Sequence, residues 1–250
     1  MNINSDINVL GSLSDFGLIN IFLNENVKSI NGNGGYQSFT SMKTMKSFKR
    51  FESAINNTLL KFRNSNIEVM VRKVLDTEKI SFDSLLILFW NASANNDLLD
   101  YLNQKVYFPA FYSGRVAIKK DEVVACLEEL KQTEFSMKKW SDSTINTTAS
   151  KYLTLLKKFN LMEGGLNKTI SHHYMSDKLL MLFVYWLLAI ETKSNILESK
   201  WLQYSFSEKE FFIQRIMQKK YIKFITLDYS GDKLKIEPAI SYEALYNELK

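Results

Sequence analysis

The sequence has only one cysteine, two prolines and nine glycines among its 250 residues. The single cysteine, Cys126, excludes an intramolecular disulfide and is typical of a protein from a reducing cytoplasm. Few prolines and glycines favour helices that are not separated by long flexible linkers. A chain of this length can bury a sizeable core. We therefore expect a mainly α-helical protein; together with the alternating segments described below, this predicts a helical bundle with small β-hairpins.

Residues suited to catalysis are also scarce. The only two histidines, His172 and His173, are adjacent, so on a strand they would point to opposite faces. No cysteine or further histidine lies at metal-ligand spacing from them, and no Gly-x-Ser-x-Gly sequence provides a serine nucleophile. We expect a protein that is not an enzyme and that needs neither a cofactor nor a metal.

Long apolar runs are missing as well. The longest, LLMLFVYWLLAI at residues 179–190, has twelve residues, whereas a membrane-spanning helix needs about 20. The first residues lack the basic and apolar regions of a signal peptide. The sequence thus predicts a cytoplasmic protein without a membrane partner, in which residues 176–190 form a buried central helix.

The most informative feature that is present is an amphipathic helix expected over residues 141–159. Ser141 is a suitable N-cap, and Asp142 places a negative charge where the helix dipole favours one. Apolar residues recur at helical spacing on one face. The opposite face carries Asn146, Thr147, Ser150, Lys151, Thr154, Lys157 and Lys158. Such a face suits contact with a polyanion, but an ordinary solvated helix has the same pattern.

The neighbouring segments suggest a DNA-binding motif. A shorter helix is expected at residues 121–131, and a polar turn joins it to the long helix. Gly164 and Gly165 then form a turn, and residues 168–175 alternate well enough for a short strand. Helix, turn, helix and hairpin is the outline of a winged helix, whose second helix enters the major groove. Asn167 and Lys168 would lie in its wing.

Positive charge is concentrated in two segments. The whole chain carries +5, while residues 36–63 alone carry +5, residues 131–160 carry +4 and residues 64–130 carry −3. The cations at the start of an expected helix over residues 41–63 are Lys43, Lys46, Lys49 and Arg50. Two basic segments around an acidic one suggest an anionic partner that touches discrete surfaces, although solvated helix faces remain an alternative.

The remaining elements complete a three-part division of the chain. A capped helix after Ser207 precedes two alternating runs around Ser230-Gly231-Asp232, which predict a second hairpin. We expect an N-terminal helical region at 1–116, a winged-helix-like region with a buried helix at 117–190, and a C-terminal helix-plus-hairpin region at 191–250.

The sequence WSDST at residues 140–144, the lysine-rich helix after it and the LMEGG end at 161–165 resemble the BrxA family of bacterial BREX phage-defence systems. The resemblance implies a part in phage defence beside the system's methyltransferase, ATPase and other subunits. The helical part of the family has been likened to the RNA-binding antitermination factor NusB, which implies RNA as another possible ligand.

From the residues and the resemblance together we predict a non-enzymatic component that binds double-stranded DNA. Lysines would neutralise phosphates, while Asn146, Thr147 and Ser150 would lie near base edges. Two alternatives stay open: a structural subunit whose polar helix docks on another defence protein, and a NusB-like RNA-binding protein. Few aromatic side chains in the basic segments can be spared from the core for stacking on RNA bases.

Overall fold

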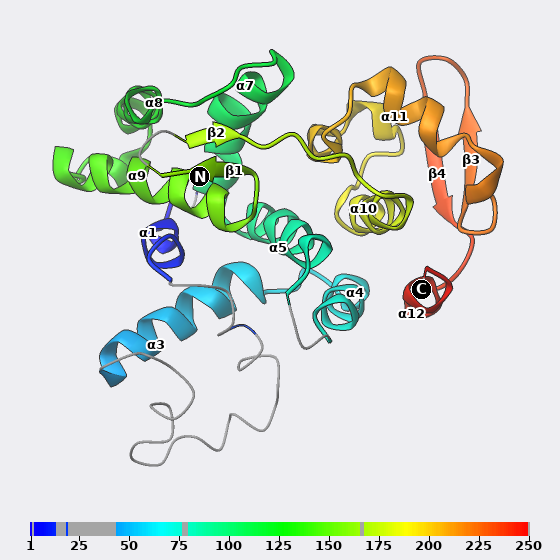
Figure 1. Cartoon of the computed structure of the whole chain (residues 1–250), viewed down its shortest axis with the longest axis horizontal. Helices are drawn as coiled ribbons and strands as arrows, with labels where there is room; N and C mark the ends of the chain where they lie inside the picture. Colours follow the sequence, from blue (N-terminus) through cyan, green and yellow to red (C-terminus); the bar gives the residue numbers. More distant parts are fainter. Residues whose placement is uncertain (2, 14–18, 20–43, 77–79, 166–167, 250) are drawn as a thin grey trace. The chain divides into compact units, whose positions relative to one another are not determined.

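The computed structural model describes residues 1, 3–13, 19, 44–76, 80–165 and 168–249 (Figure 1). The chain forms two compact units. Unit 1 comprises Met1–Lys61 and Lys79–His172, and unit 2 comprises Phe62–Glu78 and His173–Lys250. This division differs from the three consecutive regions drawn from the sequence, because a helix from the first half of the chain packs with the C-terminal elements.

Unit 1 is built mainly from helices. Its described elements are α1 (Asp6–Leu10), α3 (Met45–Ala54), α5 (Phe82–Asn95), α6 (Asp97–Leu102), α7 (Phe108–Tyr112), α8 (Lys120–Thr133), the short 3-10 helix Phe135–Met137 and α9 (Asp142–Lys158), with a hairpin of β1 (Met162–Gly164) and β2 (Lys168–Ile170). Two five-residue π-helical turns, Ile55–Leu59 and Asn103–Tyr107, continue α3 and α6. The expected mainly α-helical class with small hairpins is confirmed for the described residues.

The helices of unit 1 begin where polar side chains can cap them. The Ser141 side chain accepts a hydrogen bond from the Thr144 N–H at 3.2 Å, which confirms the expected cap of α9. Asn96 caps α6 in the same way through the Leu99 N–H at 2.9 Å. The asparagine-rich run before it, NASAN at residues 91–95, forms the last part of α5.

Two of those asparagines anchor the end of the π-helical turn 55–59. Asn91, which is fully buried, donates from Nδ2 to the carbonyl oxygens of Leu59 (2.7 Å) and Lys61 (3.1 Å). Asn95 donates to the carbonyl oxygens of Thr58 (3.1 Å) and Lys61 (2.7 Å). Carbonyl groups at a helix end have no partner in the helix, so these side chains from α5 satisfy them.

A buried polar chain links α9 to the rest of unit 1. The Tyr152 hydroxyl of α9 donates to Oδ1 of Asn103 at 3.0 Å, and Asn103 Nδ2 donates to Ser93 Oγ at 3.0 Å. Ser93 in turn donates to the Phe89 carbonyl at 2.8 Å. Tyr152 and Asn103 have no exposed surface and Ser93 has 1%. The packing of α9 is therefore fixed by hydrogen bonds as well as by apolar contact.

Unit 2 surrounds a buried helix. Its described elements are α4 (Ser65–Leu75), α10 (Asp177–Ile190), α11 (Lys209–Ile216), α12 (Tyr242–Glu248), the short 3-10 helices Ile196–Glu198, Lys200–Ser205 and Lys219–Tyr221, and a hairpin of β3 (Ile225–Tyr229) and β4 (Leu234–Pro238). Residues 179–187 of α10 are all buried, which confirms the central helix expected from the apolar run. No helix among the described residues has the length and apolarity that crossing a bilayer requires.

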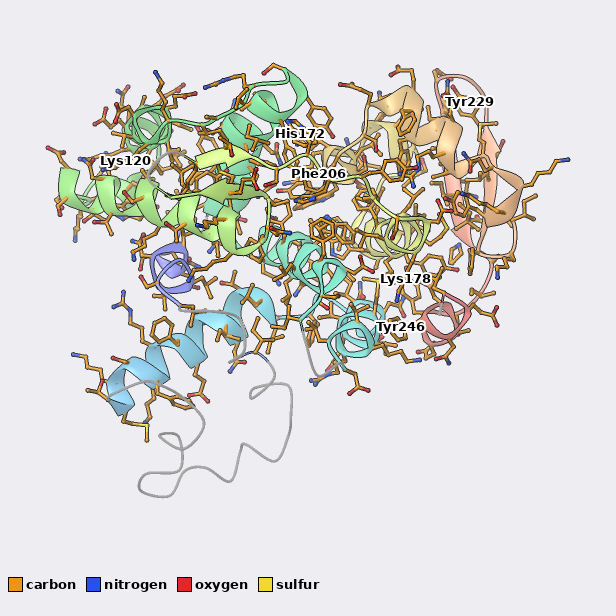
Figure 2. The ribbon with its side chains drawn as sticks, in the orientation of Figure 1. Lys120, His172, Lys178, Phe206, Tyr229 and Tyr246 are labelled. Carbon is orange, nitrogen blue, oxygen red and sulfur yellow. The ribbon has the colours of Figure 1, made fainter. Side chains whose placement is uncertain are left out.

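Charged groups hold α11 and α12 on the start of α10. The Arg215 side chain of α11 is only 4% exposed and donates to the Met175 carbonyl at 2.9 Å. Asp177 accepts hydrogen bonds from the Lys220 ammonium and, at 2.5 Å, from the Tyr221 hydroxyl. On the other side, the Lys178 ammonium lies 5.0 Å from the centre of the Tyr246 ring of α12 (Figure 2).

The Tyr152–Asn103 hydrogen bond gives a first prediction. Tyr152→Phe should lower the free energy of unfolding by about 1–3 kcal/mol, because the buried Asn103 oxygen loses the hydrogen bond from the Tyr152 hydroxyl. Urea unfolding followed by circular dichroism measures the effect. Adding Asn103→Leu should recover part of the loss, since the buried amide oxygen is then removed as well. Equal midpoints for wild type and Tyr152→Phe would contradict the role of the bond.

The Asp177 cluster gives a prediction for acid. Hydrogen bonds from Lys220, then from Tyr221, hold the pKa of Asp177 below its ordinary value. Its contribution to stability is therefore complete above the unfolded-state pKa, about 3.9, and is lost as the pH falls through the folded-state pKa. Denaturant unfolding should show a constant stability gap between wild type and Asp177→Asn above about pH 5, narrowing below about pH 4. A gap that stays constant down to pH 2 would argue against the cluster.

Candidate nucleic-acid interface

Three segments of unit 1 pair around the β1–β2 hairpin. The strands are antiparallel, with Met162 opposite Ile170 and Gly164 opposite Lys168. The segment before α8 joins them on the other side of β2: Ala117 forms an antiparallel bridge with Thr169, and the Ile170 N–H donates to the Val116 carbonyl at 2.8 Å. β2 therefore lies between Ala117 on one side and β1 on the other. In the sequence, α8 and α9 connect Ala117 to β1.

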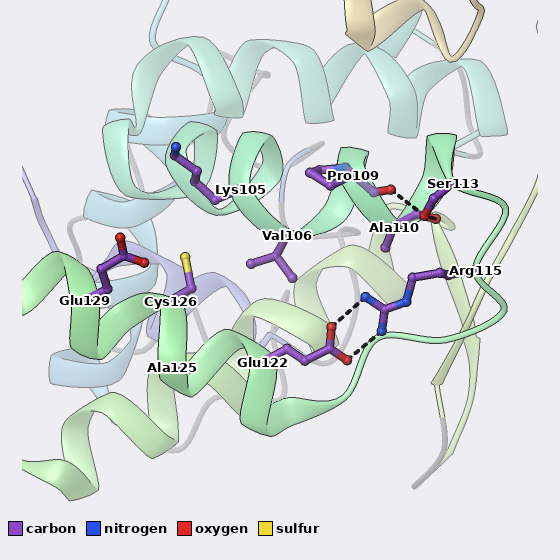
Figure 3. Close-up of a pocket in the computed structure, with 10 residues that line it drawn as sticks. All are labelled: Lys105, Val106, Pro109, Ala110, Ser113, Arg115, Glu122, Ala125, Cys126 and Glu129. Carbon is purple, nitrogen blue, oxygen red and sulfur yellow. Dashed lines mark hydrogen bonds and ion pairs between the residues drawn. The ribbon is translucent and has the colours of Figure 1, made fainter.

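An ion pair fixes the start of α8 to that first segment. The Arg115 guanidinium donates to both carboxylate oxygens of Glu122, each at 2.7 Å (Figure 3), and also to the Ala117 carbonyl at 3.2 Å. Glu122 accepts a further hydrogen bond from the Lys119 N–H at 2.9 Å. The hydrogen bond from Arg115 lowers the pKa of Glu122, so the carboxylate stays ionised near neutral pH.

A cavity of about 440 Å³ lies beside this ion pair, between α8 and residues 105–115. Figure 3 shows Arg115 and Glu122 at one end of it and Cys126 and Glu129 further along α8. Burial raises the pKa of the Cys126 thiol, which is half-buried. A thiol with a raised pKa is a poor nucleophile at neutral pH, so Cys126 lacks the property that catalytic cysteines share.

The outward face of α9 is polar and largely uncharged. Asn146, Thr147 and Lys157 are exposed, and Ser150 and Thr154 are half-buried. Several of these side chains already donate along the helix: Asn146 to the Asp142 carbonyl (3.0 Å), Ser150 to the Asn146 carbonyl (3.0 Å) and Thr154 to the Ser150 carbonyl (2.8 Å). Their oxygen atoms remain available as acceptors.

The other two lysines expected on this face, Lys151 and Lys158, are not fully exposed. A Cβ atom on Gly11, directly after α1, would stand 2.5 Å from the Lys151 carbonyl oxygen and 2.9 Å from its Cβ, so the two backbones are in close contact. Lys151 and Lys158 are both half-buried, and the Lys158 ammonium nitrogen has less than 1 Å² of exposed surface. In this arrangement Lys158 offers no charge to a partner.

The wing side of the expected interface is tied to α9. The Lys157 ammonium donates to the Gly164 carbonyl at the end of β1. Gly164 has a φ of +93°, a backbone conformation that favours glycine. Lys168 is half-buried in β2. Asn167 lies outside the described residues.

The basic residues of the N-terminal helix form a separate group. Lys46, Lys49 and Arg50 are exposed on α3. Helix α1 contacts both α3 and α9 and lies between them in Figure 1. The structure therefore does not bring the α3 cations onto the outward face of α9. Lys43 lies outside the described residues.

The structure adds residues that sequence reasoning did not single out. Ser143 is exposed on the same side of α9 as Asn146 and Thr147. In the connection between α8 and α9, Lys138 and Lys139 are exposed, and Phe135 is 80% exposed with the Lys138 ammonium 5.1 Å from its ring centre. Their place in the turn of a helix-turn-helix pattern could have indicated them.

In the described residues, the fold defines a class: a mainly α-helical protein with two small antiparallel hairpins and a helix whose outward face is polar. A family model, BrxA, matches residues 39–183, more than half of the chain. The chain therefore belongs to the BrxA family, and the resemblance of WSDST and its surroundings is confirmed; the family implies a component of BREX phage-defence systems. No curated protein and no solved structure matches it.

The close contact between α1 and α9 gives a prediction with a matched control. Gly11→Ala should destabilise unit 1 by about 1–3 kcal/mol, because the new methyl group collides with the Lys151 backbone. Gly165→Ala should change stability little, since nothing lies within 4 Å of its added Cβ. Urea unfolding compares the two variants. Equal stabilities would mean that α1 does not pack on α9 at this place.

Proposed function

We propose that this BrxA-family protein is a non-enzymatic component of a BREX system that binds double-stranded DNA through residues 117–170. One observation carries the proposal: Ala117 pairs with β2 beside β1, while α8 and α9 connect these segments. Two helices joined by a turn and followed by a hairpin, with a single β-bridge from a residue before the first helix, resemble the outline of a winged helix. In such proteins the second helix reads the major groove.

In this proposal α9 is the groove-facing helix. Asn146, Thr147 and Ser150 lie on its outward face, where an amide and hydroxyl groups can meet base edges. Lys138, Lys139 and the wing residue Lys168 would contact phosphates. Lys151 lies at the margin of this face, beside α1, and would reach the DNA backbone only from there. The Lys158 ammonium is covered, so Lys158 is not one of the proposed DNA contacts.

Most of the affinity should come from phosphate contacts. The outward face of α9 offers one asparagine amide and several hydroxyl groups whose donors are engaged in the helix. Few side chains are thus suited to bidentate base contacts, and lysines supply the rest. Binding should depend little on sequence and weaken steeply with salt, because each phosphate contact releases counterions.

A second candidate function is docking of α9 on another subunit of the system, such as its methyltransferase or ATPase. The scarcity of charge on the outward face favours it: of the residues expected there, only Lys157 is an exposed cation, and its ammonium donates to Gly164. A protein surface would tolerate such a face better than a phosphate backbone would. In either role we place the protein in the cytoplasm.

The decisive test places negative charge on the outward face of α9. The double variant Asn146→Glu and Thr147→Glu should fold normally, because both side chains are exposed, and should bind duplex DNA about tenfold or more weakly, because carboxylates repel phosphates. Fluorescence anisotropy at several salt concentrations measures the affinity. The matched control, Thr192→Glu with Ser194→Glu, adds the same charge at exposed positions of unit 2 and should bind nearly as wild type does.

A third variant tests the rival surface. Lys46→Glu, Lys49→Glu and Arg50→Glu reverse the exposed cations of α3. If this variant loses DNA binding while the α9 variant keeps it, α3 is the contact surface and the winged-helix interpretation is wrong. Absence of wild-type binding at low salt would instead favour subunit docking. Tighter binding to RNA than to duplex DNA would favour the NusB-like alternative.

A further inference from the structure

The edge of β3 in unit 2 is open, and the DNA-binding proposal does not use it. Hydrogen bonds between Phe224 and Ala239 and between Ser230 and Lys233 fix which residues of the hairpin face each other. In an antiparallel pair such residues alternate, so the backbone groups of Leu227 and Tyr229 point away from β4. Within the described part of the chain, these outward groups form no hydrogen bond.

The opposite edge of the hairpin is protected at both ends of β4, and Ile236 between them is only 5% exposed. The outward N–H of Leu234 on β4 donates to Oδ1 of Asn195 at 3.0 Å, and Asn195 also donates to the Asp232 carbonyl at 3.1 Å. Pro238 at the end of β4 has no N–H to offer. Edge strands are normally protected in such ways, so an open edge on β3 marks a site for another strand.

An apolar groove of about 300 Å³ runs beside the open edge. It is lined by Ile216, Met217, Gln218, Ile222, Ile225, Thr226 and Leu227. Met217 is 52% exposed and Ile222 is 68% exposed, although both are large apolar residues. Tyr229, at the far end of β3, is 39% exposed (Figure 2). Unit 2 thus has an exposed apolar groove beside β3 and a partly exposed aromatic side chain, Tyr229, at the end of the same strand.

We propose that β3 pairs antiparallel with β3 of a second copy of this chain, forming a four-stranded sheet around a two-fold axis at Leu227. This register pairs the whole strand and satisfies the outward backbone groups of Leu227 and Tyr229. It places Tyr229 of the second copy opposite Ile225, on the side of the sheet that faces the groove. Each groove then holds the tyrosine of the other copy, which makes the contact self-complementary.

The charges also fit an antiparallel self-pairing. The residues before β3 include Lys219, Lys220, which is paired with Asp177, and Lys223, which lies 3.8 Å from Glu248. Residues 228–233, at the far end of β3 and in the turn, carry a net charge of −1. The two-fold axis brings the basic end of each copy to the acidic end of the other. Asp228 faces Thr226 of the second copy, so no like charges stand directly opposite. A register centred on Asp228 would place two carboxylates face to face.

Substitutions at the exposed Thr226 test both the partner and the register. Sedimentation equilibrium of the full chain without DNA should show a reversible dimer. Thr226→Lys, which faces Asp228 of the second copy, should lower the dimer dissociation constant, and Thr226→Asp should raise it. Each change occurs twice by symmetry, so the shift should lie between about twofold and about 30-fold. Leu227→Lys, which places two ammonium groups at the axis, should give a monomer.

The controls use a threonine outside unit 2. Thr147→Lys and Thr147→Asp make the same charge changes on an exposed residue of unit 1 and should leave the dissociation constant unchanged. Thermal unfolding of each variant checks that the hairpin is intact. If the wild-type chain stays monomeric at its highest soluble concentration, the proposal is wrong. The β3 edge would then be expected to bind a strand of another protein. Shifts of equal sign for both Thr226 variants, or equal shifts at Thr147, overturn it as well.

Discussion

The arrangement of unit 1 depends on the buried hydrogen bonds of Asn103. Its amide accepts from Tyr152 on α9 and donates to Ser93 on α5, so one side chain fixes two helices relative to the π-helical turn that contains it. A buried amide without partners costs free energy, whereas a satisfied one permits a single arrangement of its neighbours. The Asn91 and Asn95 contacts with residues 58–61 act in the same way at the other end of α5. Polar groups rather than shape alone thus orient the helix proposed to meet DNA.

That orientation decides which part of α9 reaches solvent. Gly11 brings α1 against the Lys151 backbone, and the Lys158 ammonium is covered, so the accessible surface of α9 lies away from these two lysines. It centres on Ser143, Asn146 and Thr147, a surface with fewer charges than the sequence suggested. The α3 cations lie beyond α1 and form a second basic surface. Two candidate contact surfaces within one unit explain why charge counting alone could not choose between them.

Unit 2 follows a different principle, in which charged groups surround an apolar helix. Asp177 stays ionised through Lys220 and Tyr221, and the buried Arg215 finds the Met175 carbonyl beside it. These contacts place α11 and the following turn beside β3 and so shape the apolar groove along its edge. The hairpin protects one edge with Asn195 and Pro238 and leaves the other open. Such a difference between the two edges is expected where the unprotected edge binds another strand.

The sequence by itself determined the helical class, the cap of α9 at Ser141, the buried helix at 179–187 and the family, because these follow from local spacing and from a short motif. Only the tertiary structure decided that α4 joins the C-terminal elements and that Ala117 pairs with β2. It also decided that the Lys158 ammonium is covered. Periodicity shows which face of a helix is apolar but not which neighbour covers the margin of its polar face. That depends on contacts between residues more than a hundred positions apart, such as Gly11 and Lys151.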